Sequence, residues 1–593
     1  MIIHKFLLSA FIFSFGHAVC AYEGSMSDEQ VQGAIQMMRM DEVFNQYLAT
    51  VQLFDPEQAT RYGLHGSDQN LTPRSLKNEQ QKVDAFRSYL AKVNQLDYDV
   101  LPEENKIDYN LFRSKLLVDL LAIEKLQPLR RRPQYYLESV DSVYGLLTKD
   151  FGPYTQRAED ALSRLEQLPG VLSEAEQNLY HPAKIWVDKA IAQCDDVNNS
   201  FPDMLSRFKQ YIGMDPMLRK RVETAVENAK KAVERYRQYL ADDVMVQADG
   251  DFRAGEEIFG YYLERWHMID ESPSKIYRMM KKNFRNAHAA YNDELKHYLE
   301  SDKSASGSYD DVIYEIGADH PKADAVTDVF RDTIERAYNH FDKYRILPLP
   351  KERLKILPTP EYMRTHADAA FYNQPYDLDK DRVADVFVTL PDRKLAPEAQ
   401  EKILRQLFNI ATIEMAVAQE AFPGRHLQDS MSLRVTRIRR VIPQPFIQNG
   451  WAAYAQYLAL ERGYFSHHAA KLVYLRWDLL RSARALLDVM LHTQRITYEK
   501  AEDFLVEEVG LTAAQAKAEI LAISESPTTF VAPVYGRDAI IEARGSIENM
   551  LDRKFDLRDF HTKLLELGNV PVSTIESQLK ATYKNYSDYL RLK

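Results

Sequence analysis

Apolar residues recur three and four positions apart along most of the chain, as in the stretches Tyr211–Leu240 and Ser274–Leu299. This spacing places them on one face of an amphipathic α-helix. The pattern predicts a mainly α fold, a large multi-helix body that encloses a cleft.

The middle of the chain breaks this pattern. "YRILPLPKERLKILPTPEYM" (Tyr344–Met363) has too many prolines for a helix, and "RVADVFVTLP" (Arg382–Pro391) alternates β-branched and other residues as a strand does. We therefore predict a small β element within residues 344–391.

Apolar residues at helical spacing run up to and into the most informative segment, "IEMAVAQEAFPGRHLQD" (Ile413–Asp429). Pro423 and Gly424 should end that helix, which places Gln419 and Glu420 in its last turn. This spacing predicts one continuous helix through Ile403, Leu404, Leu407, Ile410 and Val417.

The first residues are typical of an export signal. Lys5 precedes the apolar run "FLLSAFIFSF", and "VCA" (Val19–Ala21) offers small residues for cleavage before Tyr22. The run is too short to span a membrane, and "HAVC" before the cleavage point is a poor lipid-attachment motif. We predict a signal peptide over 1–21 and an exported, periplasmic or secreted protein without a stable membrane anchor. A buried N-terminal helix is the alternative.

Composition narrows the remaining classes. The 593 residues are 45% hydrophobic and 27% charged, which is typical of a globular protein. The net charge of −11 argues against a nucleic-acid partner, whose phosphates require a basic surface. Without internal repeats or long Gly/Ser linkers, residues 22–593 are predicted to form a single domain. Cys194 alone follows the signal peptide, so no internal disulfide is expected.

The segment around Glu420 resembles a zinc-peptidase helix, but with a changed ligand. In an H-E-x-x-H helix, two histidines one turn apart bind the metal and the glutamate activates water. Here Gln419 precedes Glu420, and the residue one turn after Gln419 is Pro423. A second ligand would have to come from Arg425 or His426.

Several motifs together resemble the bacterial family named domain of unknown function 885, whose members are regarded as helical metallopeptidases. "QEAFPGRHLQ" (Gln419–Gln428) resembles its H-E-A-x-P-G-H-H-x-Q signature. Further similarity, in the family's order, lies in "NGWAAYAQ" (Asn449–Gln456), "RALLDVMLH" (Arg484–His492) and "FHTKLLELGNVPVSTIESQL" (Phe560–Leu579), and more weakly in "YGLHGSD" (Tyr62–Asp68) and "GEEIFGYYL" (Gly255–Leu263). The resemblance covers most of the mature chain and implies a helical peptidase scaffold.

The departures from the family motifs fall on the residues that a metal would need. Amides are poor Zn²⁺ ligands, and a guanidinium repels a dication. The resemblance therefore implies degenerate metal positions, with no metal or other cofactor bound. These positions are Gln419, Arg425, Asn449 and Gln456.

Other polar residues remain candidates for a cleft. Glu420 would be a vestigial general base, or simply an ion-pair partner near a helix end. Asp488 and His492 are four apart and could orient a substrate or form an ordinary helical contact. His426 and Tyr535 are further candidates for substrate binding, with packing as the alternative role of the tyrosine.

Three functional hypotheses remain open. The favoured one is an exported peptidase-like protein without a functional zinc site, which binds a peptide or a protein partner. The alternative is an active zinc-dependent peptidase or other hydrolase whose ligands lie elsewhere, with Glu420 as base and His426 or His492 helping to hold the metal. A metal-independent acid–base enzyme using Glu420, His426, His492 and Tyr535 is the third.

Overall fold

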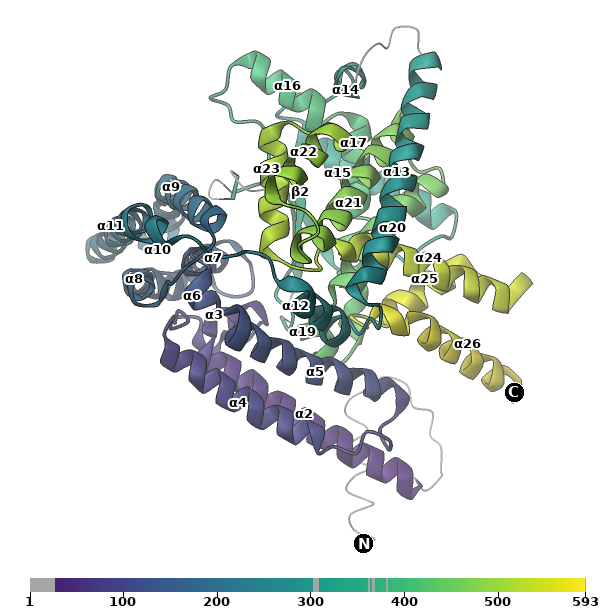
Figure 1. Ribbon diagram of the computed structural model, residues 1–593, viewed down its shortest axis with the longest axis horizontal. Coiled ribbons are helices and arrows are strands. Elements are labelled where there is room, and N and C mark those ends of the chain that lie inside the picture. Colours follow the sequence, from purple (N-terminus) through teal and green to yellow (C-terminus); the bar gives the residue numbers. More distant parts are fainter. Residues whose placement is uncertain (1–26, 302–308, 361–362, 365–367, 380–381, 592–593) are drawn as a thin grey trace.

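The computed structural model describes residues 27–301, 309–360, 363–364, 368–379 and 382–591 (Figure 1). Helices account for most of them, and the strands form one small sheet, which confirms the predicted mainly α class. The predicted signal peptide, 1–21, lies outside the described residues. Within the described part of the chain, no helix combines the length and apolar content that a membrane span requires.

The N-terminal helices lie side by side in one layer (Figure 1). Ser27 begins the first of them with a capping box, because its hydroxyl accepts from Gln30 N and the Gln30 side chain accepts from Ser27 N. Their contact is aromatic, with the Phe44 and Phe112 rings 5.1 Å apart at 86°. The helices are α2 (Asp28–Phe54), α3 (Pro56–Arg61), α4 (Leu76–Asn94) and α5 (Glu103–Leu121).

A second group of helices packs around its own core, in which Tyr136, Tyr144 and Leu165 are fully buried. The helices lie together at one side of the molecule (Figure 1). They are α6 (Pro128–Arg131), α7 (Gln134–Thr148), α8 (Tyr154–Asn178), α9 (Lys184–Arg207), α10 (Lys209–Ile212) and α11 (Pro216–Tyr239). The predicted helical stretch from Tyr211 is interrupted, since Gly213 has φ +51° and Pro216 begins α11.

The remaining α-helices follow from residue 255 onward. Among them, α20 and α24 cross at two glycines: a Cβ on Gly536 would lie 1.9 Å from the Phe446 carbonyl oxygen, and one on Gly450 would lie 2.6 Å from Gly536. Only glycine permits this approach. The helices are α12 (Gly255–Tyr261), α13 (Pro273–Ser301), α14 (Tyr309–Ile316), α15 (Val326–Lys343), α16 (Pro397–Leu407), α17 (Ile410–Glu420), α18 (Arg425–Met431), α19 (Arg437–Val441), α20 (Pro445–Glu461), α21 (Ala470–His492), α22 (Tyr498–Val509), α23 (Ala513–Glu525), α24 (Val531–Leu551), α25 (Leu557–Glu566) and α26 (Ile575–Arg591).

The small sheet lies where the sequence predicts it. Its strands are β1 (Arg353–Pro358), β2 (Ala370–Asn373) and β3 (Val383–Val388), in the order β1-β3-β2. β3 runs parallel to β1 and antiparallel to β2, so Val386 pairs with both Ile356 and Tyr372. Val386 also belongs to a core shared with α15, α16 and α17, which fixes the sheet beside the end of α17.

The prediction of one helix from Ile403 to Glu420 is wrong. The chain breaks at Phe408, and Asn409 starts a new helix by accepting a hydrogen bond from Thr412 N at 2.9 Å. An asparagine favours this capping geometry over a helix interior. The apolar stripe continues across the break, which is why spacing alone did not reveal it.

A cavity of about 1300 Å³ agrees with the predicted cleft. Its wall comes from α2, α3, α4, α5, α7 and α9 on one side, and from residues 363, 368–377 and 440–448 on the other. The cavity therefore lies between the N-terminal helices and the half of the chain that contains the predicted site residues.

Candidate functional site

The turn between α17 and α18 places the predicted site. Gln419 and Glu420 occupy the last turn of α17, as expected, and Pro423 and Gly424 follow. A Cβ on Gly424 would lie 1.9 Å from the Gln419 carbonyl oxygen, so this tight approach requires glycine. Arg425 begins α18 directly after it.

The Glu420 carboxylate is only 7% exposed, and both of its oxygens have partners. Oε1 accepts from Gln419 Nε2 at 2.7 Å, and Oε2 accepts from the backbone N of Tyr372 in β2 at 3.0 Å. Arg425 Nε lies 3.3 Å from Oε2. Glu420 thus joins α17 to the sheet and is paired with a cation from its own chain.

The four positions predicted to be degenerate metal positions form a connected polar network. Arg425 Nη2 donates to Asn449 Oδ1 at 2.9 Å. Arg481, from α21, reaches Gln456 Oε1 at 2.5 Å and lies 3.5 Å from Gln419 Oε1. The structure therefore brings all four positions into one network through two guanidinium groups.

This donor set does not fit zinc. It offers amide oxygens, one paired carboxylate and two cations, whereas a catalytic zinc site takes three imidazole or carboxylate ligands. No group of three or more His, Cys, Asp or Glu side chains with metal-binding geometry occurs among the described residues. Burial lowers the pKa of Arg481, yet its contacts are those of a hydrogen-bond donor.

His426 lies beside this network but faces away from it. His426 is 1% exposed, its Nε2 lies 3.2 Å from the Glu352 carbonyl oxygen, and its Nδ1 has no hydrogen-bond partner within the described parts of the chain. Burial lowers its pKa, which favours the neutral ring. Tyr372, whose backbone N binds Glu420, also lies beside His426, with the two ring centres 6.1 Å apart. The Tyr372 hydroxyl donates to Asp429 Oδ2 at 2.7 Å.

Asp488 and His492 lie in the core, both at 0% exposure. The Asp488 carboxylate accepts from the backbone N atoms of Thr528, Phe530 and Val531, and so caps the start of α24. His492 Nε2 is 3.9 Å from Asp488 and donates instead to the Ile523 carbonyl oxygen at 2.9 Å. Burial raises the pKa of Asp488 to about 7 and lowers that of His492 to about 4.

Tyr535 also lies apart from the Glu420 network. Its hydroxyl donates to Glu271 Oε2 at 3.2 Å, and its ring packs edge-on against Phe446 at 5.4 Å. Burial, and then the Glu271 charge, raise its pKa. Neither Tyr535 nor the Asp488 and His492 pair lines the cavity.

The sequence analysis did not predict the charged residues that line the cavity. Their ion pairs include Lys82 with Glu79 at 2.6 Å, Lys115 with Asp119 at 2.5 Å, and Lys189 with Glu525 at 2.7 Å. These residues lie on helices whose acidic and basic positions look like ordinary solvated faces in the sequence. Only the packing of several helices around one space gives them a common environment.

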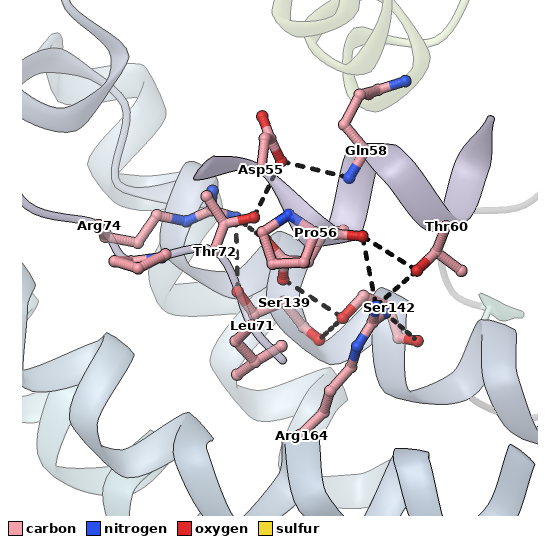
Figure 2. Close-up of polar contacts among 12 residues, drawn as sticks. Asp55, Pro56, Gln58, Thr60, Leu71, Thr72, Arg74, Ser139, Ser142 and Arg164 are labelled. Atoms are coloured by element: carbon pink, nitrogen blue, oxygen red, sulfur yellow. Dashed lines mark hydrogen bonds and ion pairs between the residues drawn. The ribbon is translucent and has the colours of Figure 1, made fainter. Parts of the chain in front are cut away.

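Figure 2 shows how part of this wall is held. Asp55 caps α3 by accepting from Gln58 N at 3.2 Å, and it also accepts from the Thr72 hydroxyl at 2.9 Å. Arg164 extends from α8 to donate to the Thr60 hydroxyl at 2.6 Å. These contacts join α3 to the second group of helices and fix the cavity wall between them.

One histidine joins the two sides of the cavity. His65 Nδ1 lies 2.8 Å from Asp68 Oδ2, and its Nε2 lies 2.8 Å from Asp379 Oδ1, after β2. Burial alone would lower its pKa, but the two carboxylates outweigh it and raise the pKa to about 9. His65 belongs to "YGLHGSD", whose weak family resemblance was the one sequence signal for this contact.

One family model matches the chain. The family described as "Bacterial protein of unknown function (DUF885)" matches residues 56–579. No curated protein matches the chain.

Two solved structures share the fold. One is "a putative lipoprotein of unknown function" from Shewanella oneidensis, with 21% identity and a TM-score of 0.74 over 92% of this chain and 99% of that one. The other is a "putative lipoprotein" from Colwellia psychrerythraea, with 16% identity and a TM-score of 0.76 over 93% and 100%. With the family match over residues 56–579, the chain belongs to the bacterial DUF885 family of unknown function.

Proposed function

We propose that this protein is an exported, peptidase-like binding protein that holds peptides in its cavity without hydrolysing them through zinc. The observation that supports this most directly is the set of contacts between Arg425, Glu420 and Asn449. In a zinc peptidase the corresponding glutamate must be free to polarise a metal-bound water. Here both oxygens of Glu420 have protein partners, and the positive charge beside it is the Arg425 guanidinium.

The replacements also preserve a stable polar interior. Gln456 donates to the Met415 carbonyl oxygen at 3.1 Å while accepting from Arg481. A buried amide with both groups paired avoids the cost of an unsatisfied polar atom. The polar groups of the network are therefore paired with one another, and these contacts require neither a metal ion nor another ligand.

The cavity supports the binding part of the proposal. Its volume, about 1300 Å³, exceeds that of sites for small molecules, roughly 300–1000 Å³. Asp368 connects it to the degenerate site, because it lines the cavity and Glu420 and Arg425 are among the charges that act on its carboxylate. A peptide in the cavity would thus lie beside the position where the family motif places its metal.

Export is part of the same proposal. The apolar run at Phe6–Phe15 and the small residues at Val19–Ala21 motivate it, and two proteins of this fold are described as putative lipoproteins. Intact-mass measurement of protein from the envelope fraction gives the cleavage point and shows whether Cys20 is retained with a lipid.

The functional test combines metal analysis with a peptide assay. Protein spanning Tyr22–Lys593, purified without chelator, should contain far less than one zinc per chain and should bind a mixture of capped pentapeptides without cleaving them. Stoichiometric zinc, together with chelator-sensitive hydrolysis that Glu420→Gln abolishes, would overturn the proposal in favour of an active peptidase.

A further inference from the structure

Four side chains with acceptor oxygens line the cavity from α7 and α9. Gln134, Glu138 and Asp141 are spaced four and three apart on α7, so they share one face of that helix. All three line the cavity, as does Gln193 from α9, which packs against α7. We call these four residues the acceptor wall.

The amides of the acceptor wall have unused acceptors. Gln134 is 5% exposed, and its Nε2 donates to the Trp186 carbonyl oxygen at 3.0 Å, which fixes the orientation of the amide. Its Oε1 is buried and has no hydrogen-bond partner among the residues that the structure describes, and the same holds for Gln193 Oε1. Leaving a buried acceptor unpaired is unfavourable, so a donor from outside the chain would relieve this cost.

The carboxylates of the acceptor wall are also unpaired. Within the part of the chain that the structure describes, neither Glu138 nor Asp141 has a hydrogen-bond or ion-pair partner. Burial raises the pKa of both, that of Asp141 to about 6, and the Glu138 charge raises the pKa of Asp141 further. Two neighbouring carboxylates without a direct ion-pair partner among the described residues favour an incoming cation.

Two of the three arginines that act on Glu138 are paired with other residues. Arg74 lies 2.9 Å from Glu57, and Arg61 donates to Gln58 Oε1 at 3.0 Å. The Arg132 guanidinium lies 6.0 Å from the Trp186 ring. These three arginines lower the pKa of Glu138 through their charge, but none forms an ion pair with it.

The chemistry of the wall selects an organic cation over a metal ion. The described residues contain no group of three carboxylate, histidine or cysteine side chains placed around one point, as a divalent ion would require. A guanidinium or ammonium instead brings several N–H donors spread over a few ångströms, which matches acceptors distributed along two helices.

We propose that the acceptor wall binds a basic side chain of the peptide ligand, so that the cavity selects peptides containing arginine or lysine. This specificity rests on the proposed peptide-binding function and deepens it. Aromatic side chains on the cavity wall, including Phe86, Trp266 and Phe371, offer apolar contacts to the neighbouring residues of such a peptide.

The test uses two peptides that differ only in charge. Acetyl-Ala-Phe-Arg-Phe-Ala-amide carries one guanidinium, and its citrulline counterpart replaces this group by a neutral urea of nearly the same shape. Titration calorimetry with the full mature chain should give at least about 10-fold tighter binding of the arginine peptide, because charge-assisted hydrogen bonds are roughly twice as strong as neutral ones.

Variants assign the preference to the acceptor wall. In Glu138→Gln/Asp141→Asn the arginine-to-citrulline ratio should fall to about one, with each single substitution giving a partial loss that keeps the test valid if the double variant unfolds. Glu223→Gln, on the exposed face of α11, should leave the ratio unchanged. Equal binding of the two peptides by the unaltered protein, or a ratio that survives the double substitution, would overturn this inference alone. Failure of both peptides and of the pentapeptide mixture to bind would overturn the proposed function itself.

Discussion

Arg425 Nε lies 3.3 Å from Glu420 Oε2, so its guanidinium neutralises the buried carboxylate at the end of α17. This contact explains how the Glu420 carboxylate can be buried at the turn between α17 and α18. A buried carboxylate without a cation would be costly, and Arg425 supplies that cation from within the same turn.

Replacing three residues of the network by metal ligands should create a zinc site. Gln419→His/Arg425→His/Asn449→Glu introduces two imidazoles and a carboxylate in place of the amides and the guanidinium, which supplies the three ligands of a zinc site. We expect about one zinc per chain and a melting temperature that rises with added zinc, since a ligand at 100 times its Kd stabilises by about 2.7 kcal/mol. Metal analysis and thermal unfolding measure both. Arg425→His alone, with one added ligand, is the control, and a zinc response in the unaltered protein would contradict the expectation.

Glu420→Gln should reduce stability. The amide retains an oxygen for Tyr372 N, but it removes the charge opposite Arg425. We expect a loss of about 1–3 kcal/mol in the free energy of unfolding, measured with urea. Glu398→Gln, at an exposed position in the first turn of α16, should change it by less than about 0.5 kcal/mol. Unchanged or increased stability of the Glu420 variant would indicate a strained catalytic carboxylate.

Asp488→Ala should destabilise the protein without altering peptide binding. Three backbone N–H groups at the start of α24 would lose their acceptor inside the core. Hydrogen bonds to a charged group contribute about 1.5–3 kcal/mol each, so a loss above roughly 2 kcal/mol is expected in urea unfolding. Asp488→Asn retains one acceptor oxygen and should cost less. A fall in peptide affinity in the folded Asn variant would instead assign Asp488 a role in binding.

The sequence predicted the helical class, the small sheet and the last turn of α17, because each depends on local periodicity or on a proline and glycine stop. It missed the break at Asn409, since a capping asparagine leaves the apolar spacing intact. It also placed Asp488 and His492 in a cleft on the strength of their spacing, whereas the structure shows them fully buried, away from the cavity lining.

The cavity wall could not be predicted for a different reason. Gln134 and Lys149, at the two ends of α7, come to line the same cavity as Asp377 only when α7 packs opposite the segment after β2. Burial then raises the pKa of Asp377 to about 7 and lowers that of Lys149 to about 8, effects that no local pattern encodes.

The contacts of His65 with Asp68 and Asp379 predict a loss of stability at alkaline pH. The folded pKa of about 9 lies above the unfolded value near 6.5, so the contribution is complete below about pH 6.5 and is lost as the pH rises through 9. Melting temperatures measured from pH 6 to pH 10 should fall more steeply for the unaltered protein than for His65→Gln. Parallel curves would contradict a charged His65 between Asp68 and Asp379.

Lys149 should react as a neutral amine at a lower pH than an ordinary lysine does. Burial lowers its pKa to about 8, and Nζ lies 4.6 Å from the Tyr376 ring and donates to the Gln374 carbonyl oxygen. Amines acylate only when neutral, so the labelling rate of Lys149, followed by peptide mass spectrometry, should reach half its maximum near pH 8. Acetyl-lysine-amide, with the ordinary lysine value of about 10.4, is the control. Because Lys149 lines the cavity, a saturating arginine peptide should slow this labelling, and an unchanged rate would place the bound peptide outside the cavity.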